Sequence, residues 1–184
     1  MSLHYSISMI IQTDIPLLED ILQSSIEKLG SDFISYRNHC LRVFNFCTAF
    51  TEKNKIDKDK IAIAIAFHDL GIWTHNTFDY LKPSQTLARE YLIKTDRIAW
   101  INEIETMIAN HHKIRKFPND LAESFRKADW IDISLGSLKF GLPKSFVSET
   151  RSTFPNAGFH KKLTILTAQW TLKHPFNPLP MMKL

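Results

Sequence analysis

Apolar side chains recur every three or four residues along most of the chain, which is the spacing of one face of an α-helix. One such stripe contains Tyr36, Cys40, Val43, Cys47 and Phe50. Capping residues and glycines divide the pattern into separate segments. Together they predict helices over about 14–30, 32–50, 57–71, 85–94, 96–112, 119–134 and 158–173.

The segment IAIAIAF at 61–67 fits two kinds of structure. Strict alternation of Ile and Ala is compatible with a strand, because side chains of a strand alternate between its two faces. Alanine is itself apolar and is the best helix former, so the same segment also fits a helix buried on nearly all sides. We favour the helix and expect Gly71 to end it.

The composition supports one folded domain. The chain has 184 residues, of which 44% are hydrophobic, and a domain of this size buries roughly 70% of its surface. No repeat, heptad register or linker interrupts the pattern. We predict an all-α, single-domain multi-helix bundle spanning 1–184, with seven or eight helices and an irregular, proline-rich tail over about 174–184.

Charge and cysteine content bear on partners and compartment. The net charge is +4 and the basic residues are dispersed, so we do not expect nucleic-acid binding, whereas a small anionic ligand remains compatible. Cys40 and Cys47 would lie about 10 Å apart along a helix, too far for a disulfide. The N-terminus lacks a signal-peptide pattern, and the longest apolar run, 61–67, is too short for a membrane span. We expect a soluble, cytoplasmic protein.

Polar side chains interrupt the apolar stripes of four helices. His39, the pair His68-Asp69, His111 with His112 beside it, and Asp129 stand where the helical pattern expects apolar residues. Each one alone has an ordinary explanation, as a hydrogen-bonded core histidine, a cap or an ion-pair partner. Together they offer imidazole and carboxylate groups that could converge between helices, a mixed set that suits Mn, Fe, Co, Ni or Zn.

The order His39…His68-Asp69…Asp129 resembles the H…HD…D signature of the HD superfamily of metal-dependent phosphohydrolases. The local sequences YRNHCLRV, AIAIAFHDLG and FRKADWIDI are similar too, and the resemblance covers about 31–134. It implies an HD-type bundle with a divalent metal ion (Mn, Fe, Co, Ni, Mg or Zn) held by these four residues between core helices. It also implies hydrolysis of a small phosphate ester, such as a nucleotide or a related metabolite.

Two departures from the known branches of the superfamily limit what the resemblance implies. The deoxynucleoside 5′-monophosphatase branch has a Glu three residues after the HD pair, where this chain has Ile72. The pair His111-His112 is similar to that of the cyclic-dinucleotide phosphodiesterases, but the GYP segment is missing. We assign catalytic roles to Asp69, His111 and His112. The two histidines could bind a second ion, bind phosphate or protonate a leaving group.

An anionic substrate needs positively charged or hydrogen-bonding partners. Lys113 and Arg115 follow the histidine pair directly and are our preferred phosphate contacts. Arg37, Arg42, Arg126 and Lys127 lie near the candidate ligands in sequence, and a solvated surface position is the simpler explanation for them. The aromatic segment 73–81 could form a pocket wall, with His75 as a substrate contact.

Other functions remain open at this point. Some HD proteins hydrate small nitriles or oxidise substrates at iron, and the missing Glu keeps such a non-phosphatase enzyme in consideration. A ligand-sensing HD domain without turnover is the third possibility. Exposed aromatic residues could support a homodimer, although an all-α core accounts for them more simply.

Overall fold

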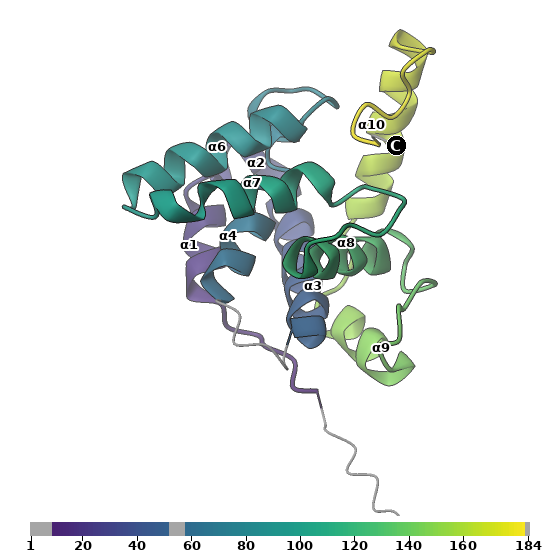
Figure 1. The fold of residues 1–184 in the computed structure, drawn as a ribbon. Coiled ribbons are helices and arrows are strands. Elements are labelled where there is room, and N and C mark those ends of the chain that lie inside the picture. Colours follow the sequence, from purple (N-terminus) through teal and green to yellow (C-terminus); the bar gives the residue numbers. More distant parts are fainter. Residues whose placement is uncertain (1–8, 52–57, 183–184) are drawn as a thin grey trace, which may run out of the picture.

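The computed structural model describes residues 9–51 and 58–182, and the regular structure of this part is entirely helical (Figure 1). The α-helices are α1 (Pro16–Gln23), α2 (Ile26–Leu29), α3 (Phe33–Thr51), α4 (Lys58–Phe67), α5 (Gly71–Thr74), α6 (Leu81–Lys94), α7 (Ile101–Asn110), α8 (Asp120–Ile133), α9 (Lys144–Thr153) and α10 (Phe159–Lys173). Two short 3-10 helices, η1 (Gly30–Asp32) and η2 (Ile98–Trp100), precede α3 and α7. The all-α prediction is confirmed.

The helix boundaries differ from the predicted ones in several places. The first predicted helix is broken at Ser24 and Ser25 into α1 and α2, and α6 begins at Leu81 rather than after Pro83. The fifth ends at Asn110, so the two histidines follow α7 instead of belonging to it. The predicted start of the third helix at Asp57, and the position of His4, lie outside the described residues.

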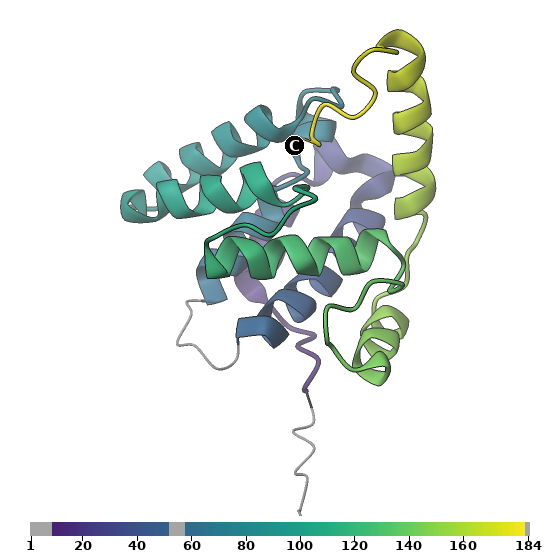
Figure 2. The same ribbon diagram turned by 45° about the vertical axis from the view of Figure 1, so that its right-hand side comes forward.

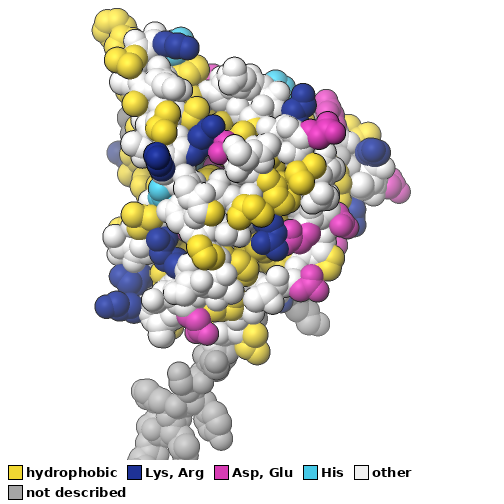
Figure 3. Space-filling model, turned by 180° about the vertical axis from the view of Figure 1, so that it is seen from behind, with side chains coloured by type: hydrophobic (Ala, Val, Ile, Leu, Met, Phe, Trp, Pro, Cys, Tyr) yellow, Lys and Arg dark blue, Asp and Glu magenta, His cyan; other side chains and the backbone are white. Residues whose placement is uncertain are grey.

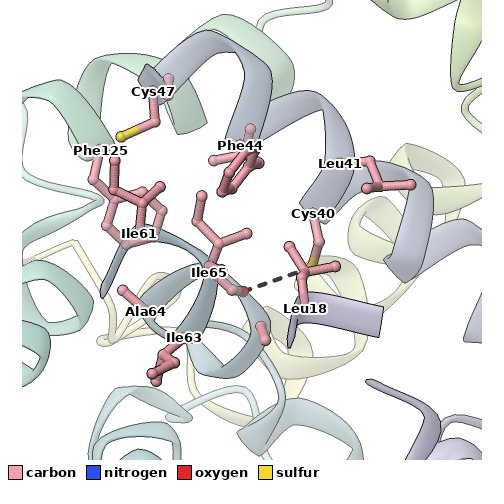
Figure 4. Packing of buried hydrophobic residues seen from close by; sticks show 14 of the residues in the cluster. Leu18, Cys40, Leu41, Phe44, Cys47, Ile61, Ile63, Ala64, Ile65 and Phe125 are labelled. Carbon is pink, nitrogen blue, oxygen red and sulfur yellow. Dashed lines mark hydrogen bonds between the residues drawn. The ribbon is translucent and has the colours of Figure 1, made fainter. Parts of the chain in front are cut away.

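The core is built around α3 and α4, as Figure 4 shows. Every side chain of α4 from Ile61 to Phe67 is buried, which confirms a helix surrounded on all sides rather than a strand. Phe44 on α3 and Phe125 on α8 pack into the same cluster. Cys40 and Cys47 are buried in it as free thiols, as expected. The two long helices α3 and α8 cross beside each other and carry two of the four candidate ligands.

The helix α10 stands at the side of this bundle, and the chain after it turns back along it (Figures 1 and 2). Phe159 is its one fully buried side chain in the described structure. Beyond α10, residues 174–182 form turns without a helix, and Met181 is buried in a second, smaller apolar cluster with Ile72, Phe78, Tyr80 and Leu81. This second cluster joins the end of the chain to the segment that follows α5.

The surface carries both signs of charge. On the face seen in Figure 3, basic side chains are most frequent on the side of α9 and α10, while basic and acidic side chains alternate on the opposite side. Within the described parts, 9–51 and 58–182, no helix has the length and apolarity needed to cross a bilayer.

Candidate metal centre

Four polar side chains from three separate parts of the sequence meet in the middle of the bundle. His39 comes from α3, His68 and Asp69 from the turn after α4, and Asp129 from α8, and all four are essentially inaccessible to solvent. His39 Nε2 lies 3.0 Å from His68 Nε2 and 3.6 Å from Asp129 Oδ1. His68 Nε2 lies 3.4 Å from Asp69 Oδ2. The structure therefore brings together the four residues that the sequence suggested as ligands.

The imidazole rings are held in one orientation by hydrogen bonds on their outer side. His68 Nδ1 donates to the carbonyl oxygen of Ile65 at 2.6 Å, and His111 Nδ1 donates to that of Ile108 at 2.7 Å. A carbonyl can only accept, so each Nδ1 carries a proton, and in the neutral ring Nε2 then presents a lone pair to the centre. These outer hydrogen bonds fix the tautomer that binds a metal ion.

Several polar atoms at the centre have no hydrogen-bond partner although they are fully buried. They are Asp69 Oδ1, both carboxylate oxygens of Asp129, and His111 Nε2. Burying such groups without partners is costly, and native proteins seldom leave them so. Carboxylate and imidazole lone pairs aimed at one point are the donor set that a divalent transition-metal ion accepts. The residues present therefore fit a metal ion.

The candidate ligands form two groups that share one carboxylate. The first group is His39, His68 and Asp69, and the second is Asp69, His111 and His112, with the ligand atoms of each group within 4.8 Å of one another. Asp69 Oδ1 faces His111 Nε2 at 3.4 Å, while Oδ2 faces His68. Asp129 faces both groups, because its Oδ2 lies 3.5 Å from His112 Nδ1. The centre thus offers donors for one ion or for two.

Burial sets the protonation of these groups. It lowers the pKa of His68 to about 3, and burial followed by the neighbouring His111 lowers the pKa of His112, so both imidazoles are neutral at neutral pH. Burial, followed by the charges of Asp69 and Asp132, raises the pKa of Asp129 well above its ordinary value. Neutral imidazole is the form that binds metal.

A small residue lets the neighbouring segment close over this centre. Gly71 is buried two residues after Asp69. A Cβ at this position would lie 2.7 Å from the carbonyl oxygen of Tyr80 and 2.9 Å from Ser84 Oγ. The Gly71 amide donates to Ser84 Oγ at 3.0 Å. Because a side chain is absent here, the start of α6 packs against the turn and Tyr80 reaches the histidine pair.

Asp132 supports the centre from behind, a role that the sequence pattern did not predict. Its Oδ2 accepts from His39 Nδ1 at 2.7 Å, and Arg42 binds both of its oxygens, with Nε at 2.5 Å and Nη2 at 2.8 Å. The spacing in the sequence could have indicated this role. Asp132 follows Asp129 by three residues and Arg42 follows His39 by three, which places each pair on one helix face. Arg42 is therefore buried in an ion pair and is not a substrate contact.

Replacing Asp132 by asparagine is expected to weaken metal binding by about 10- to 100-fold, the usual effect of losing a carboxylate behind a metal-binding histidine. The asparagine still accepts a hydrogen bond from His39 Nδ1. It lacks the negative charge that makes the imidazole a stronger metal ligand. Competition with a chromophoric chelator measures the change. The control is Glu19→Gln, which breaks the partly exposed ion pair between Glu19 on α1 and Arg37 on α3. Equal metal affinity of the Asp132 variant and the control would contradict this role.

A cavity of about 490 Å³ opens on the centre. Asp69, Tyr80 and His112 line it, and so do Phe78 and Trp130. The aromatic segment 73–81 thus contributes two side chains to a pocket wall, as the sequence suggested.

The three residues expected to contact substrate lie elsewhere. His75 is exposed, with its Nδ1 2.9 Å from Thr74 Oγ1, and Arg115 is exposed too. Lys113 is half-buried, with its Nζ 5.4 Å from the centre of the Phe117 ring. None of the three lines the cavity, although all lie in the described part of the chain. For Lys113 and Arg115 the physical reason is that α7 ends at Asn110, so the chain turns inward with the two histidines and then runs out along the surface; His75 follows the end of α5 and faces solvent.

The fold and the site define a class of protein: an all-helical domain that gathers histidines and aspartates between its core helices into a candidate metal centre. The chain belongs to the HD domain family, whose model matches residues 36–134, more than half of the sequence. This range contains all four residues of the H…HD…D signature. Searches among curated proteins and among solved structures gave no significant match.

Proposed function

We propose that this protein is a metal-dependent phosphohydrolase that acts on a small phosphate ester. The observation that carries the proposal is the set of buried, unpartnered lone pairs of Asp69, Asp129 and His111 at the HD signature. A divalent ion at such a site polarises a phosphoryl oxygen and lowers the pKa of a coordinated water. His39, His68, Asp69 and Asp129 would hold the ion, with His111 and His112 available for a second one.

The chain's own residues supply a proton where the cavity meets the centre. Tyr80 Oη lies 2.5 Å from His112 Nε2, and both side chains line the cavity. Burial, followed by the charges of Asp69 and Asp129, raises the pKa of Tyr80, so its hydroxyl keeps its proton beside His112. A group that leaves phosphorus at this end of the cavity would take up a proton from this pair.

One observation favours a second candidate function. No lysine or arginine is among the described residues that line the cavity, whereas sites for phosphate commonly use such side chains. A non-phosphatase HD enzyme, of the hydratase or iron oxygenase type, would need no such charge. Metal content and product formation separate the two candidates.

Elemental analysis of the purified protein, followed by assays of phosphomonoesters and phosphodiesters with Mn, Co, Ni, Fe, Mg and Zn, tests the proposal. We expect phosphate release that requires added metal and is lost on chelation. Bound iron without phosphate release would favour the second candidate instead. Bound metal without turnover of any substrate would point to a ligand-sensing domain and contradict both enzymatic functions.

A further inference from the structure

We propose that the cavity beside the metal centre binds an apolar organic group, so that the preferred substrates carry an aryl or alkyl moiety rather than a nucleoside. The inference rests on the proposed function in taking the metal centre as the place of reaction. It concerns the part of the substrate that does not react. The cavity has a volume of about 490 Å³, within the range of roughly 300–1000 Å³ that is usual for sites of small organic ligands.

The first support is the chemical character of the cavity walls. Phe78, Trp130, Ile133, Leu163, Met181 and Met182 line it. The described lining residues include no lysine, no arginine and one carboxylate, Asp69, which belongs to the metal centre. The ion would hold the reacting group, and the rest of the cavity offers an apolar surface.

The second support is that the polar side chains of the walls already have partners within the chain. Thr164 Oγ1 donates to the carbonyl oxygen of His160 at 2.9 Å, and Thr167 Oγ1 donates to that of Leu163 at 2.8 Å. His160 Nε2 lies 2.9 Å from the carbonyl oxygen of Asp132, and its Nδ1 lies 2.7 Å from Asn156 Nδ2. A nucleoside would bring ring nitrogens and ribose hydroxyls to walls whose side chains already donate their hydrogens within the chain. Removing these polar groups of the nucleoside from water without new hydrogen-bond donors is unfavourable.

The third support is where the walls come from. The range 36–134 that matches the HD family holds the metal centre, but Leu163, Thr167, Leu179, Met181 and Met182 lie beyond it, on α10 and in the segment that turns back along α10. α10 is fixed to the centre at its base, where the Phe159 ring stacks on His39 with ring centroids 4.1 Å apart. The parts of the chain outside the family match therefore supply one side of the cavity, which is where substrate preference would be set.

Binding to the metal-free protein tests this inference independently of any turnover. Titration calorimetry with 1-naphthol and with adenosine uses the 184-residue chain after chelation of metal. We expect 1-naphthol to bind and adenosine to bind at least tenfold more weakly. Thr167→Trp, which places a large side chain in the cavity, should weaken 1-naphthol binding at least tenfold. Ile165→Trp, on the same helix at an exposed position that does not line the cavity, should leave it unchanged.

Tighter binding of adenosine, or 1-naphthol binding that is unchanged in Thr167→Trp, would overturn the inference. Thermal unfolding checks that each variant folds, and Ala168→Phe, at another lining position, replaces Thr167→Trp should the latter not fold. Absence of phosphate release with 1-naphthol binding as expected would overturn the proposed function and leave the apolar site standing.

The metal-loaded enzyme gives a second measurement. For ethyl, butyl and hexyl phosphate, kcat/KM is expected to rise by about three- to fourfold per added methylene, the gain from removing one methylene from water. Glycerol phosphate and adenosine monophosphate should be poorer substrates than hexyl phosphate. A flat series, or adenosine monophosphate as the best substrate, would overturn the inference even though the protein is then a phosphohydrolase.

Discussion

Asp69→Ala and His68→Ala are each expected to abolish metal binding and to lower metal-dependent activity by more than about 100-fold. Loss of a residue that only hydrogen-bonds to a metal ligand already lowers metal affinity or activity by about 10- to 100-fold. The loss of a direct ligand should therefore lower them more. Asp69 is the most sensitive position, because its two oxygens face different histidines and it belongs to both candidate ligand groups. Without it, neither group keeps three ligands.

Elemental analysis and phosphate release, measured on the same preparations, check this expectation. Asp79→Ala is the control, since Asp79 is an exposed aspartate ten residues further along and is not part of either ligand group. Circular dichroism shows that each variant keeps its helices. Metal retained at wild-type stoichiometry in both variants would rule out the assignment of these residues as ligands.

Asp129→Asn is expected to have opposite effects on stability with and without metal. In the metal-free protein both carboxylate oxygens of Asp129 are buried without a hydrogen bond, a situation that costs about 1–3 kcal/mol or more. Replacing the carboxylate by a neutral amide should therefore increase the free energy of unfolding of the metal-free protein by about that amount. With metal at about 1,000 times its Kd, the wild type gains about 4.1 kcal/mol, which exceeds that advantage, and the variant gains little. The order of stability then reverses.

The difference in stability between the metal-free Asp129→Asn variant and the metal-free wild type should depend on pH. The pKa of Asp129 is raised by burial and then by Asp69 and Asp132. A carboxyl group whose pKa is higher in the folded protein contributes its full stability below the unfolded pKa and loses it as the pH rises through the folded pKa. The advantage of the metal-free asparagine variant should therefore grow from pH 5 to pH 8. Urea denaturation with and without chelator measures it, and a metal-free variant less stable than the wild type at pH 8 would contradict the account.

The helical pattern was sufficient to predict most of the fold, because burial of an apolar stripe decides where a long helix forms. The stripe through Cys40 and Cys47 marks α3, and the alanines of 61–67 mark α4. α9 was not predicted, since KSFVSETRST is mostly polar and buries only Phe146, Val147 and Thr150. Its helical form depends on packing against the rest of the domain, which a local pattern does not reveal.

The residues that meet at the candidate metal centre could be predicted from the sequence, and the contacts around them could not. A histidine or aspartate at an apolar position stands out in one sequence, so His39, His68, Asp69 and Asp129 were found, with His111 and His112 beside them. The pair of Asp132 with Arg42 looks like two ordinary helix charges until the helices are packed. Lys113, Arg115 and His75 were selected because they are close in sequence to the ligands, but the chain carries them outward after α7 and α5. The apolar cavity depends on residues from α8, α10 and the end of the chain, whose proximity only the fold determines.

The most direct test of the central claim, that the HD signature holds a metal ion, is an anomalous difference map from crystals grown with a saturating transition metal. We predict a peak about 2.0–2.3 Å from His39 Nε2, His68 Nε2 and carboxylate oxygens of Asp69 and Asp129. A peak only at another place in the molecule, or no peak between α3, α4 and α8 at saturating metal, would contradict it.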